Sequence, residues 1–358
     1  MLSIGIVGLP NVGKSTLFNA LTKSSVLAAN YPFATIEPNV GIVPVPDNRL
    51  NKLAKLYKTN SIVPATVRFV DIAGLVAGAS KGEGLGNQFL AHIRSTSAIV
   101  EVVRAFDDSL VTHVSNNPNP KTDIEVINTE LILADIETIG KRMSILEKEA
   151  RANNKLQPQL ELYRKAASAL DNGKTVHDTL SPEELTSLSD LQLITAKPII
   201  YVFNADEDTL VDVNKKHELA DSVKPADSVF VSAKLENELN TLDDSDAAEL
   251  RESYGVHQSG LESLITAAYD TLGLQSFLTA GEKEVRAWTI PKGATAPQAA
   301  GTIHGDFERG FIAAEIVSYN DLVELGSLAA CRAAGKVRTE GKTYVMQPDD
   351  VVEFRFNV

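Results

Sequence analysis

The sequence IGIVGLPNVGKSTLF, residues 4–18, contains an apolar run, a glycine-rich turn and the start of a helix in direct succession. The run over residues 4–7 is typical of a strand buried in a parallel sheet. Residues 8–15, GLPNVGKS, place four residues between two glycines and follow the second glycine with Lys-Ser, which is the spacing of a phosphate-binding loop. Residues 16–21 predict a helix. The order strand, loop, helix predicts a nucleotide-binding α/β domain.

Each fixed residue of this loop has a physical role. Gly8 and Gly13 allow the backbone to turn tightly, so that successive N–H groups point inward toward anionic oxygens. The helix that follows adds its positive end. Lys14 supplies a point charge for the β- and γ-phosphates, and the Ser15 hydroxyl is the expected Mg²⁺ ligand.

Composition limits the class of protein. A chain of 358 residues has room for two or three domains, and 44% hydrophobic with 23% charged residues is ordinary for a globular protein. We expect no membrane span, no secretory signal and a cytoplasmic location. The net charge of −13 argues against nonspecific adsorption to DNA. The single cysteine, Cys331, is surrounded by alanines and is predicted to be a small core residue.

Two downstream segments have the residues of nucleotide-responsive loops. Thr35 lies in a proline-rich loop, residues 28–39, where its hydroxyl could bind Mg²⁺ and its N–H the γ-phosphate. Asp71 ends the predicted strand 66–72 and suits a Mg²⁺-shell carboxylate, while the N–H of Gly74 could reach the γ-phosphate. Together with the phosphate loop, these residues predict a switch-type nucleoside triphosphatase.

The rest of the chain alternates strands with helices and is interrupted by a helical segment. Apolar residues at three- and four-residue steps over 123–195 predict an antiparallel helical hairpin. We therefore expect a doubly wound, mostly parallel sheet at 1–122 and 196–276, and a small α+β domain at 277–358. In the predicted strand 97–106, Glu101 and Arg104 are expected at an edge or tip, without chemistry.

The loop after the predicted strand 197–203 determines which nucleotide base the site binds. In GTPases this loop usually reads Asn-Lys-x-Asp, with the aspartate accepting two hydrogen bonds from guanine. Here Ala205 replaces the lysine and Glu207 the aspartate after Asn204, so a longer carboxylate would crowd guanine and adenine becomes the better fit. Asp206 is adjacent and would serve guanine if the loop shifted register.

Leu75 stands where many such enzymes have the glutamine that orients the attacking water. A leucine cannot orient water, so we expect slow intrinsic turnover. Asn11 offers an oxygen ligand for K⁺ beside the phosphates, and an asparagine in a loop is equally often structural.

Taken together, these motifs resemble those of the Obg-like ATPase (YchF) family over the whole chain. The motifs that carry the resemblance are residues 8–15, YPFATIEPN at 31–39, DIAGL at 71–75, and Asn204-x-x-Glu207. The resemblance implies a Mg²⁺-dependent ATPase of the translation-factor class, a coiled-coil insertion, a C-terminal TGS domain, and association with ribosomes in translation or stress regulation.

The resemblance also implies which residues form the site. Phosphates are expected at the loop residues, Mg²⁺ at Ser15 and Thr35, the γ-phosphate end at Asp71 and Gly74, and adenine at the loops after two later strands. The implied phosphate and base contacts are Asn11, Val12, Gly13, Lys14, Ser15, Thr16, Asn204, Glu207, Ser232, Ala233 and Lys234.

Two other functions stay open from the residues. One is an Obg-type GTPase, against which Ala205 and Glu207 argue. The other is a nucleotide-gated ribosome-binding module with negligible turnover, which Leu75 keeps open.

Overall fold

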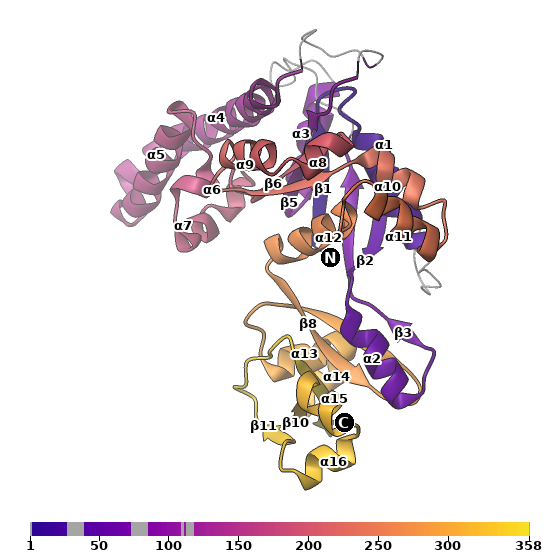
Figure 1. The fold of residues 1–358 in the computed structure, drawn as a ribbon. Helices are drawn as coiled ribbons and strands as arrows, with labels where there is room; N and C mark the ends of the chain where they lie inside the picture. Colours follow the sequence, from indigo (N-terminus) through magenta and orange to yellow (C-terminus); the bar gives the residue numbers. More distant parts are fainter. Residues whose placement is uncertain (1, 27–38, 73–84, 109–110, 112–117, 358) are drawn as a thin grey trace. The chain divides into compact units, whose positions relative to one another are not determined.

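The computed structural model describes residues 2–26, 39–72, 85–108, 111 and 118–357. The chain forms two compact units, one of residues 1–43 and 68–268 and the other of residues 44–67 and 269–358. Each unit contains a six-stranded sheet, and Figure 1 shows strands of both sheets. The mixed α/β fold predicted from the sequence is confirmed.

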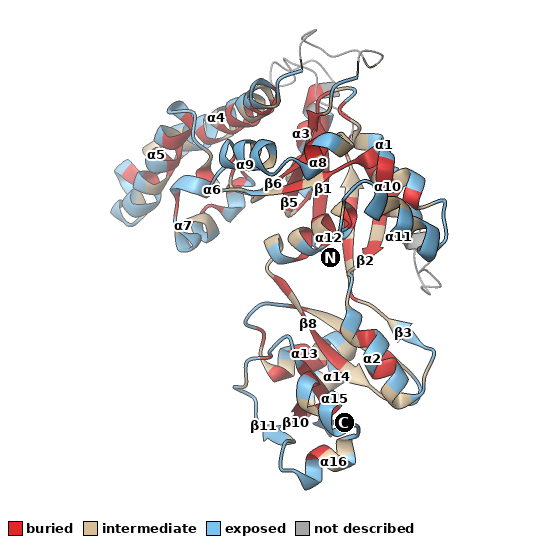
Figure 2. Ribbon diagram, in the orientation of Figure 1, coloured by how far each residue is buried: buried red, intermediate tan, exposed pale blue. Residues whose placement is uncertain are grey.

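The sheet of the first unit runs in the order β2-β4-β1-β5-β6-β7. Parallel pairing joins β4 to β1, β1 to β5, β5 to β6 and β6 to β7. All residues of β1 and β5 are buried, as expected for strands covered on both faces, and Figure 2 shows these strands in red. The strands are β1 (Ser3–Gly8), β2 (Val40–Pro44), β4 (Thr66–Asp71), β5 (Ala98–Ala105), β6 (Ile199–Ala205) and β7 (Asp227–Val231).

Helices follow these strands and cover the sheet. Because parallel strands end at a common edge, the loops after β1, β4, β5, β6 and β7 meet there. The helices are α1 (Lys14–Val26), α3 (Leu85–Ser95), α8 (Glu207–Val211), α9 (Val213–Asp221), α10 (Ala233–Leu239), α11 (Asp244–Ser253) and α12 (Gly260–Thr271).

The helical insertion has its own apolar core. A buried cluster that includes Ile139, Leu160, Tyr163 and Leu170 joins its two long helices. Ser181 and Glu184 form a capping box at the start of α7, each side chain bonding the other's backbone N–H. The elements are α4 (Pro120–Ala152), η2 (Asn154–Leu156), α5 (Gln157–Asp171), α6 (Val176–Thr179), α7 (Pro182–Ser187) and η3 (Ser189–Leu191).

The second unit packs helices on a mixed sheet of order β11-β10-β12-β8-β9-β3. Its core includes Phe277, Ile290, Phe311 and Ile316. The elements are α2 (Asn48–Tyr57), β3 (Ile62–Val63), β8 (Leu274–Ala280), β9 (Val285–Pro291), α13 (Ala296–Ile303), α14 (Gly305–Arg309), β10 (Phe311–Ser318), α15 (Tyr319–Leu325), α16 (Leu328–Ala333), β11 (Arg338–Glu340) and β12 (Asp350–Phe356).

The structure differs from the predicted domain boundaries at residues 44–67. This segment was expected inside the nucleotide domain, 1–122, yet it belongs to the second unit. Ile62 pairs with Val285, and the Arg49 guanidinium donates to the Pro348 carbonyl at 2.6 Å. Because these contacts join residues more than 220 positions apart, local pattern could not reveal them.

The expectation that Glu101 and Arg104 lie at an edge or tip is wrong for Glu101. Strand β5 lies between β1 and β6, and Glu101 is in its middle with 0% exposure. Arg104 is the second-last residue of β5, near the tip as expected, but it is buried with 1% exposure. In the sequence, a charged residue within an apolar run suggested the edge or tip of a strand. The prediction that Cys331 is a core residue is confirmed by its 0% exposure.

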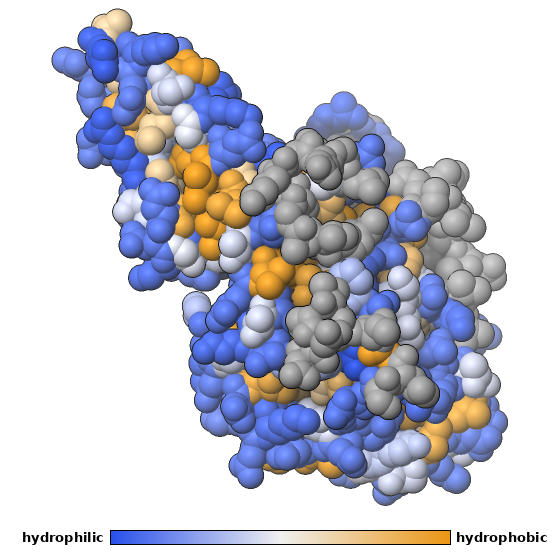
Figure 3. All heavy atoms as spheres, turned by 90° about the horizontal axis from the view of Figure 1, so that it is seen from above, coloured by the Kyte–Doolittle hydropathy of each residue, from blue (hydrophilic) through white to orange (hydrophobic). Residues whose placement is uncertain are grey.

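Among the residues that the structure describes, none of the helices has the length and apolarity that a membrane span requires. In the view of Figure 3, hydrophilic residues cover most of the coloured surface and apolar residues occur in separate groups.

Candidate nucleotide site

The loop between β1 and α1 has the shape of a phosphate cradle. Asn11 and Gly13 adopt positive φ angles of 62° and 90°. Val12 is buried and anchors the loop, while the N–H of Leu17 donates to the Gly13 carbonyl at 2.9 Å and starts the helix. The preceding N–H groups at the start of α1 thus have no partner within the helix and can bind anionic oxygens.

Close contacts explain why both glycines of the loop are needed. A Cβ atom on Gly8 would lie 2.8 Å from the Val102 carbonyl oxygen. A Cβ atom on Gly13 would lie 2.1 Å from Nδ2 of Asn204. Only glycine leaves room for these approaches.

Lys14 and Asp71 form an ion pair at the phosphate end of the site. Asp71 is the last residue of β4 and lies beside Ile6 of β1, so the sheet register delivers its carboxylate to the phosphate loop. Ser15 is exposed at the start of α1. Thr35 and Gly74, which the sequence predicts for the γ-phosphate end, lie outside the described residues.

The residues at this end fit a magnesium ion. Magnesium prefers hydroxyl, carboxylate and phosphate oxygens, and it is commonly held by one or two protein ligands together with nucleotide phosphates. Ser15 and Asp71 supply one hydroxyl and one carboxylate. Within the described part of the chain, no group of three or more His, Cys, Asp or Glu residues could hold a metal alone, so phosphate oxygens would have to complete such a site.

The buried side chain of Asn204 connects two loops of the site through hydrogen bonds. Its side chain is 6% exposed, donates to the Val12 carbonyl at 2.9 Å and accepts from the N–H of Ala233 at 2.9 Å. The amide therefore ties the phosphate loop to the loop after β7. The structure places Asn204 at the predicted site, with one hydrogen bond from each end of its amide made to backbone.

Asp206 and Glu207, the two acidic residues that follow Asn204 and Ala205, have different surroundings. Asp206 caps α8, with Oδ1 accepting from the N–H of Thr209 at 2.8 Å, so this oxygen already has a backbone donor although the residue borders the same cavity as Glu207. Burial opposes its ionisation, but the Thr209 bonds and the Lys215 charge leave the pKa of Asp206 below its ordinary value. Glu207 contacts the Ser232 hydroxyl at 3.4 Å and keeps the rest of its carboxylate toward the cavity.

A cavity of about 430 Å³ joins the phosphate loop to these residues. It brings together eight of the eleven phosphate and base contacts predicted from the sequence. Val12, which is buried beneath the loop, and Lys14 and Ser15 at the start of α1 do not line it. The predicted residues that line it are Asn11, Gly13, Thr16, Asn204, Glu207, Ser232, Ala233 and Lys234.

Sequence reasoning missed one wall of this cavity. Phe106, Asp107, Asp108 and Val111 line it from the turn after β5. The signal was present, because these residues follow a buried parallel strand and therefore lie at the edge where the other loops meet.

Comparison with known proteins identifies the family. Residues 3–133 match a model described as "50S ribosome-binding GTPase", and residues 274–357 match the model YchF-GTPase_C, described as "Protein of unknown function (DUF933)". The "Ribosome-binding ATPase YchF" of Bacillus subtilis is 50% identical over 100% of both chains, and that of Escherichia coli O157:H7 is 48% identical over 99% of both. The chain belongs to the YchF family. The resemblance drawn from its motifs is confirmed.

Solved structures agree with this assignment. The Schizosaccharomyces pombe YchF GTPase matches with a TM-score of 0.89 at 41% identity, covering 99% of this chain and 97% of that one. A GTP binding protein from Pyrococcus horikoshii OT3 matches with a TM-score of 0.61 at 19% identity, covering 99% of this chain and 100% of that one, and shows the shared fold alone.

Proposed function

We propose that this member of the YchF family is a Mg²⁺-dependent, ATP-hydrolysing switch that associates with the ribosome in the cytoplasm. The observation that favours ATP over GTP concerns the end of the cavity where the base would bind. There Glu207 offers a carboxylate, and the adjacent aspartate is already used as the cap of α8.

Hydrogen-bonding chemistry supports adenine at this position. The exocyclic amino group of adenine is a donor and pairs with an acceptor such as the Glu207 carboxylate. Guanine needs a shorter acidic side chain that receives two donors, and Asp206, the alternative noted in the sequence, accepts from Thr209 instead. The buried Ala205 provides no lysine to cover the base.

The chain's own groups act mainly by positioning and by electrostatics. Lys14 would leave Asp71 to neutralise the β- and γ-phosphates, and the N–H groups around Gly13 would hold the oxygens in place. Mg²⁺, held by Ser15 with Thr35 and the carboxylate of Asp71 nearby, would stabilise charge on the transferred phosphoryl group. Gly74 is proposed to donate to the γ-phosphate.

Hydrolysis is expected to be slow without a partner. The sequence has Leu75 in place of a water-orienting glutamine, so the attacking water needs another group, and Asn11 is a candidate ligand for a K⁺ ion beside the phosphates. Ribosome association is inferred from relatives named ribosome-binding ATPases.

A titration with non-hydrolysable ATP and GTP analogues in Mg²⁺ tests the base assignment. We expect tighter ATP binding in the wild type and a shift toward GTP in Glu207→Asp. Asp208→Asn changes an exposed neighbour that does not line the cavity and should leave the preference unchanged. Equal or tighter GTP binding in the wild type would identify a GTPase instead, the activity in the name of the S. pombe YchF GTPase.

Ribosome co-sedimentation tests the switch. We expect Lys14→Ala to abolish ATP binding and to remove the nucleotide dependence of ribosome association. Association that stays intact and insensitive to nucleotide would favour a binding module in which turnover is incidental.

A further inference from the structure

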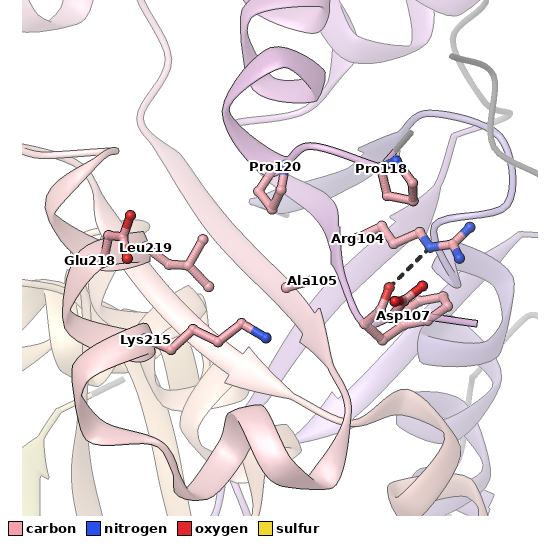
Figure 4. Close-up of a pocket in the computed structure, with 9 residues that line it drawn as sticks. Arg104, Ala105, Asp107, Pro118, Pro120, Lys215, Glu218 and Leu219 are labelled. Atoms are coloured by element: carbon pink, nitrogen blue, oxygen red, sulfur yellow. Dashed lines mark hydrogen bonds between the residues drawn. The ribbon is translucent and has the colours of Figure 1, made fainter. Parts of the chain in front are cut away.

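Arg104 is an arginine buried at the end of β5, with 1% of its surface exposed. Its guanidinium donates to three backbone carbonyls of the turn that follows. Nε reaches Phe106 at 3.2 Å, Nη1 reaches Val111 at 3.0 Å, and Nη2 reaches Asp108 at 2.9 Å. Figure 4 shows this side chain beside the turn, with a hydrogen bond drawn as a dashed line.

The geometry of arginine suits this arrangement. A guanidinium is planar, always charged and presents its N–H groups as a rigid fork, so three fixed acceptors define the path of the backbone around it. The Phe106 ring lies over the same group, with the guanidinium carbon 4.5 Å from the ring centroid. Since a buried charge is costly without partners, the side chain and the turn stabilise one another.

The turn that Arg104 holds is the wall of the nucleotide cavity that the sequence did not reveal. Phe106, Asp108 and Val111 supply the three carbonyls, and all three residues line that cavity. The Asp107 N–H also approaches Asp206 Oδ2 at 3.4 Å, which links the wall to the loop after β6.

The side of this wall that faces away from the nucleotide cavity is not closely packed, so packing does not account for the position of the wall. A second cavity of about 460 Å³ is bordered by Arg104, Pro118, Lys215 and Leu219 (Figure 4). Phe106 and Asp107 line both cavities, so the turn has open volume on two sides. Directed hydrogen bonds can fix a backbone where close packing is incomplete.

We propose that Arg104 is a positioning residue for the proposed ATP site, fixing the wall that receives the adenosine part of the nucleotide. Arg104 does not itself line the nucleotide cavity, and it acts through the carbonyls of Phe106, Asp108 and Val111. The inference rests on the proposed assignment of this cavity to adenine.

The test compares ATP with inorganic tripolyphosphate, which carries the phosphates without the adenosine. In Arg104→Lys the charge remains but the fork is lost, and we expect ATP affinity to fall about tenfold, as for the loss of one to two buried hydrogen bonds. Tripolyphosphate affinity should not change. In steady state, KM for ATP should rise while kcat at saturating ATP stays constant.

The outcomes separate this inference from the proposed function. Glu218→Gln alters the second cavity alone and should leave both affinities unchanged. Equal losses for ATP and tripolyphosphate in Arg104→Lys, or no loss for either, would overturn the positioning role. A wild type that binds tripolyphosphate as tightly as ATP would instead overturn the adenine assignment.

If Arg104→Lys does not fold, a matched pair at an exposed residue of the turn gives the same test. Asp108→Gly and Asp108→Ala both remove the carboxylate, but only glycine loosens the backbone that Arg104 holds. We expect ATP to bind about threefold more weakly to the glycine variant than to the alanine variant, with equal tripolyphosphate affinities. Equal ATP affinities in the pair would contradict the proposal.

Discussion

At the scale of single residues, the site depends on a few side chains whose partners are backbone groups. Asn204 bonds backbone groups of the loops after β1 and β7, and Arg104 bonds three carbonyls of the turn after its own strand. Residue type and spacing predicted that Asn204 belongs to the site. They could not predict that it acts as a brace, because its partners, Val12 and Ala233, are set by the register of the sheet.

Replacing Asn204 with alanine should weaken folding and nucleotide binding together. The substitution leaves the Val12 carbonyl and the Ala233 N–H buried without their partner, which costs about 1–3 kcal/mol in the free energy of unfolding. Urea unfolding and ATP titration would measure both effects. Asn154→Ala, at an exposed position, is the control. A fully stable variant with normal ATP affinity would contradict the bracing role.

Glu101 should make stability fall as pH rises. Both its carboxylate oxygens lack hydrogen-bond partners among the described residues, and burial, followed by the Asp123 charge, raises the pKa of Glu101 well above its ordinary value. The folded state therefore keeps a proton that the unfolded chain loses above about pH 4.5, so stability declines from there upward.

Glu101→Gln removes this titration. We expect the stability of the variant relative to the wild type to increase between pH 5 and pH 8 in urea unfolding. Glu137→Gln is the control, because a hydrogen bond and ion pair with Lys141 lower the pKa of Glu137. Its carboxylate is therefore charged in both the folded and the unfolded state between pH 5 and pH 8, and the stability difference should not change with pH. A pH-independent difference for Glu101→Gln would show that the carboxyl group is not held neutral.

At the scale of helices and strands, most positions follow from periodicity. The phosphate loop and the strands β4 and β6 lie where the sequence predicts them, within about two residues. Two parts did not follow. The two-residue strand β3 is too short for a pattern, and the turn after β5 gains its shape from the buried Arg104 instead of from its own turn residues.

Lys197 joins elements of the first unit and provides a pH signature. Its ammonium donates to the carbonyls of Ile93, Arg94 and Thr96 at the end of α3. Burial lowers the pKa of Lys197 from 10.5 to about 8, which Asp135 partly offsets and Arg94 reinforces.

Between pH 8 and pH 10.5 the unfolded chain binds the proton that the folded chain has lost, so this residue's contribution to stability rises with pH. We expect the wild type to gain stability relative to Lys197→Met across this window, as measured by urea unfolding. Lys336→Met should not share this gain, because the partner Asp321 raises the pKa of Lys336. A flat difference for Lys197→Met would mean that the ammonium stays protonated.

At the scale of the whole molecule, the chain order does not match the order of the units. Residues 44–67 leave the nucleotide unit, supply α2 and β3 to the second unit, and are followed by the return to β4. The helical insertion was visible in the sequence because it has a continuous apolar stripe. The excursion of residues 44–67 was not, because its contacts are made with residues beyond 269.

This arrangement predicts that a change at Asp47 acts on the C-terminal unit and leaves nucleotide binding intact. Asp47 caps α2 and pairs with Arg49, so Asp47→Ala should destabilise the second unit by about 1–2 kcal/mol. The single tryptophan, Trp288, lies in β9 and reports that unit in fluorescence-detected unfolding. Asp212→Ala removes an equivalent cap, that of α9 in the first unit, and is the matched control. We expect only Asp47→Ala to lower the Trp288 midpoint, with ATP affinity unchanged. Equal midpoint shifts from both variants would show that the two units unfold as one cooperative body. A substitution in residues 44–67 would then destabilise the whole protein instead of the second unit alone.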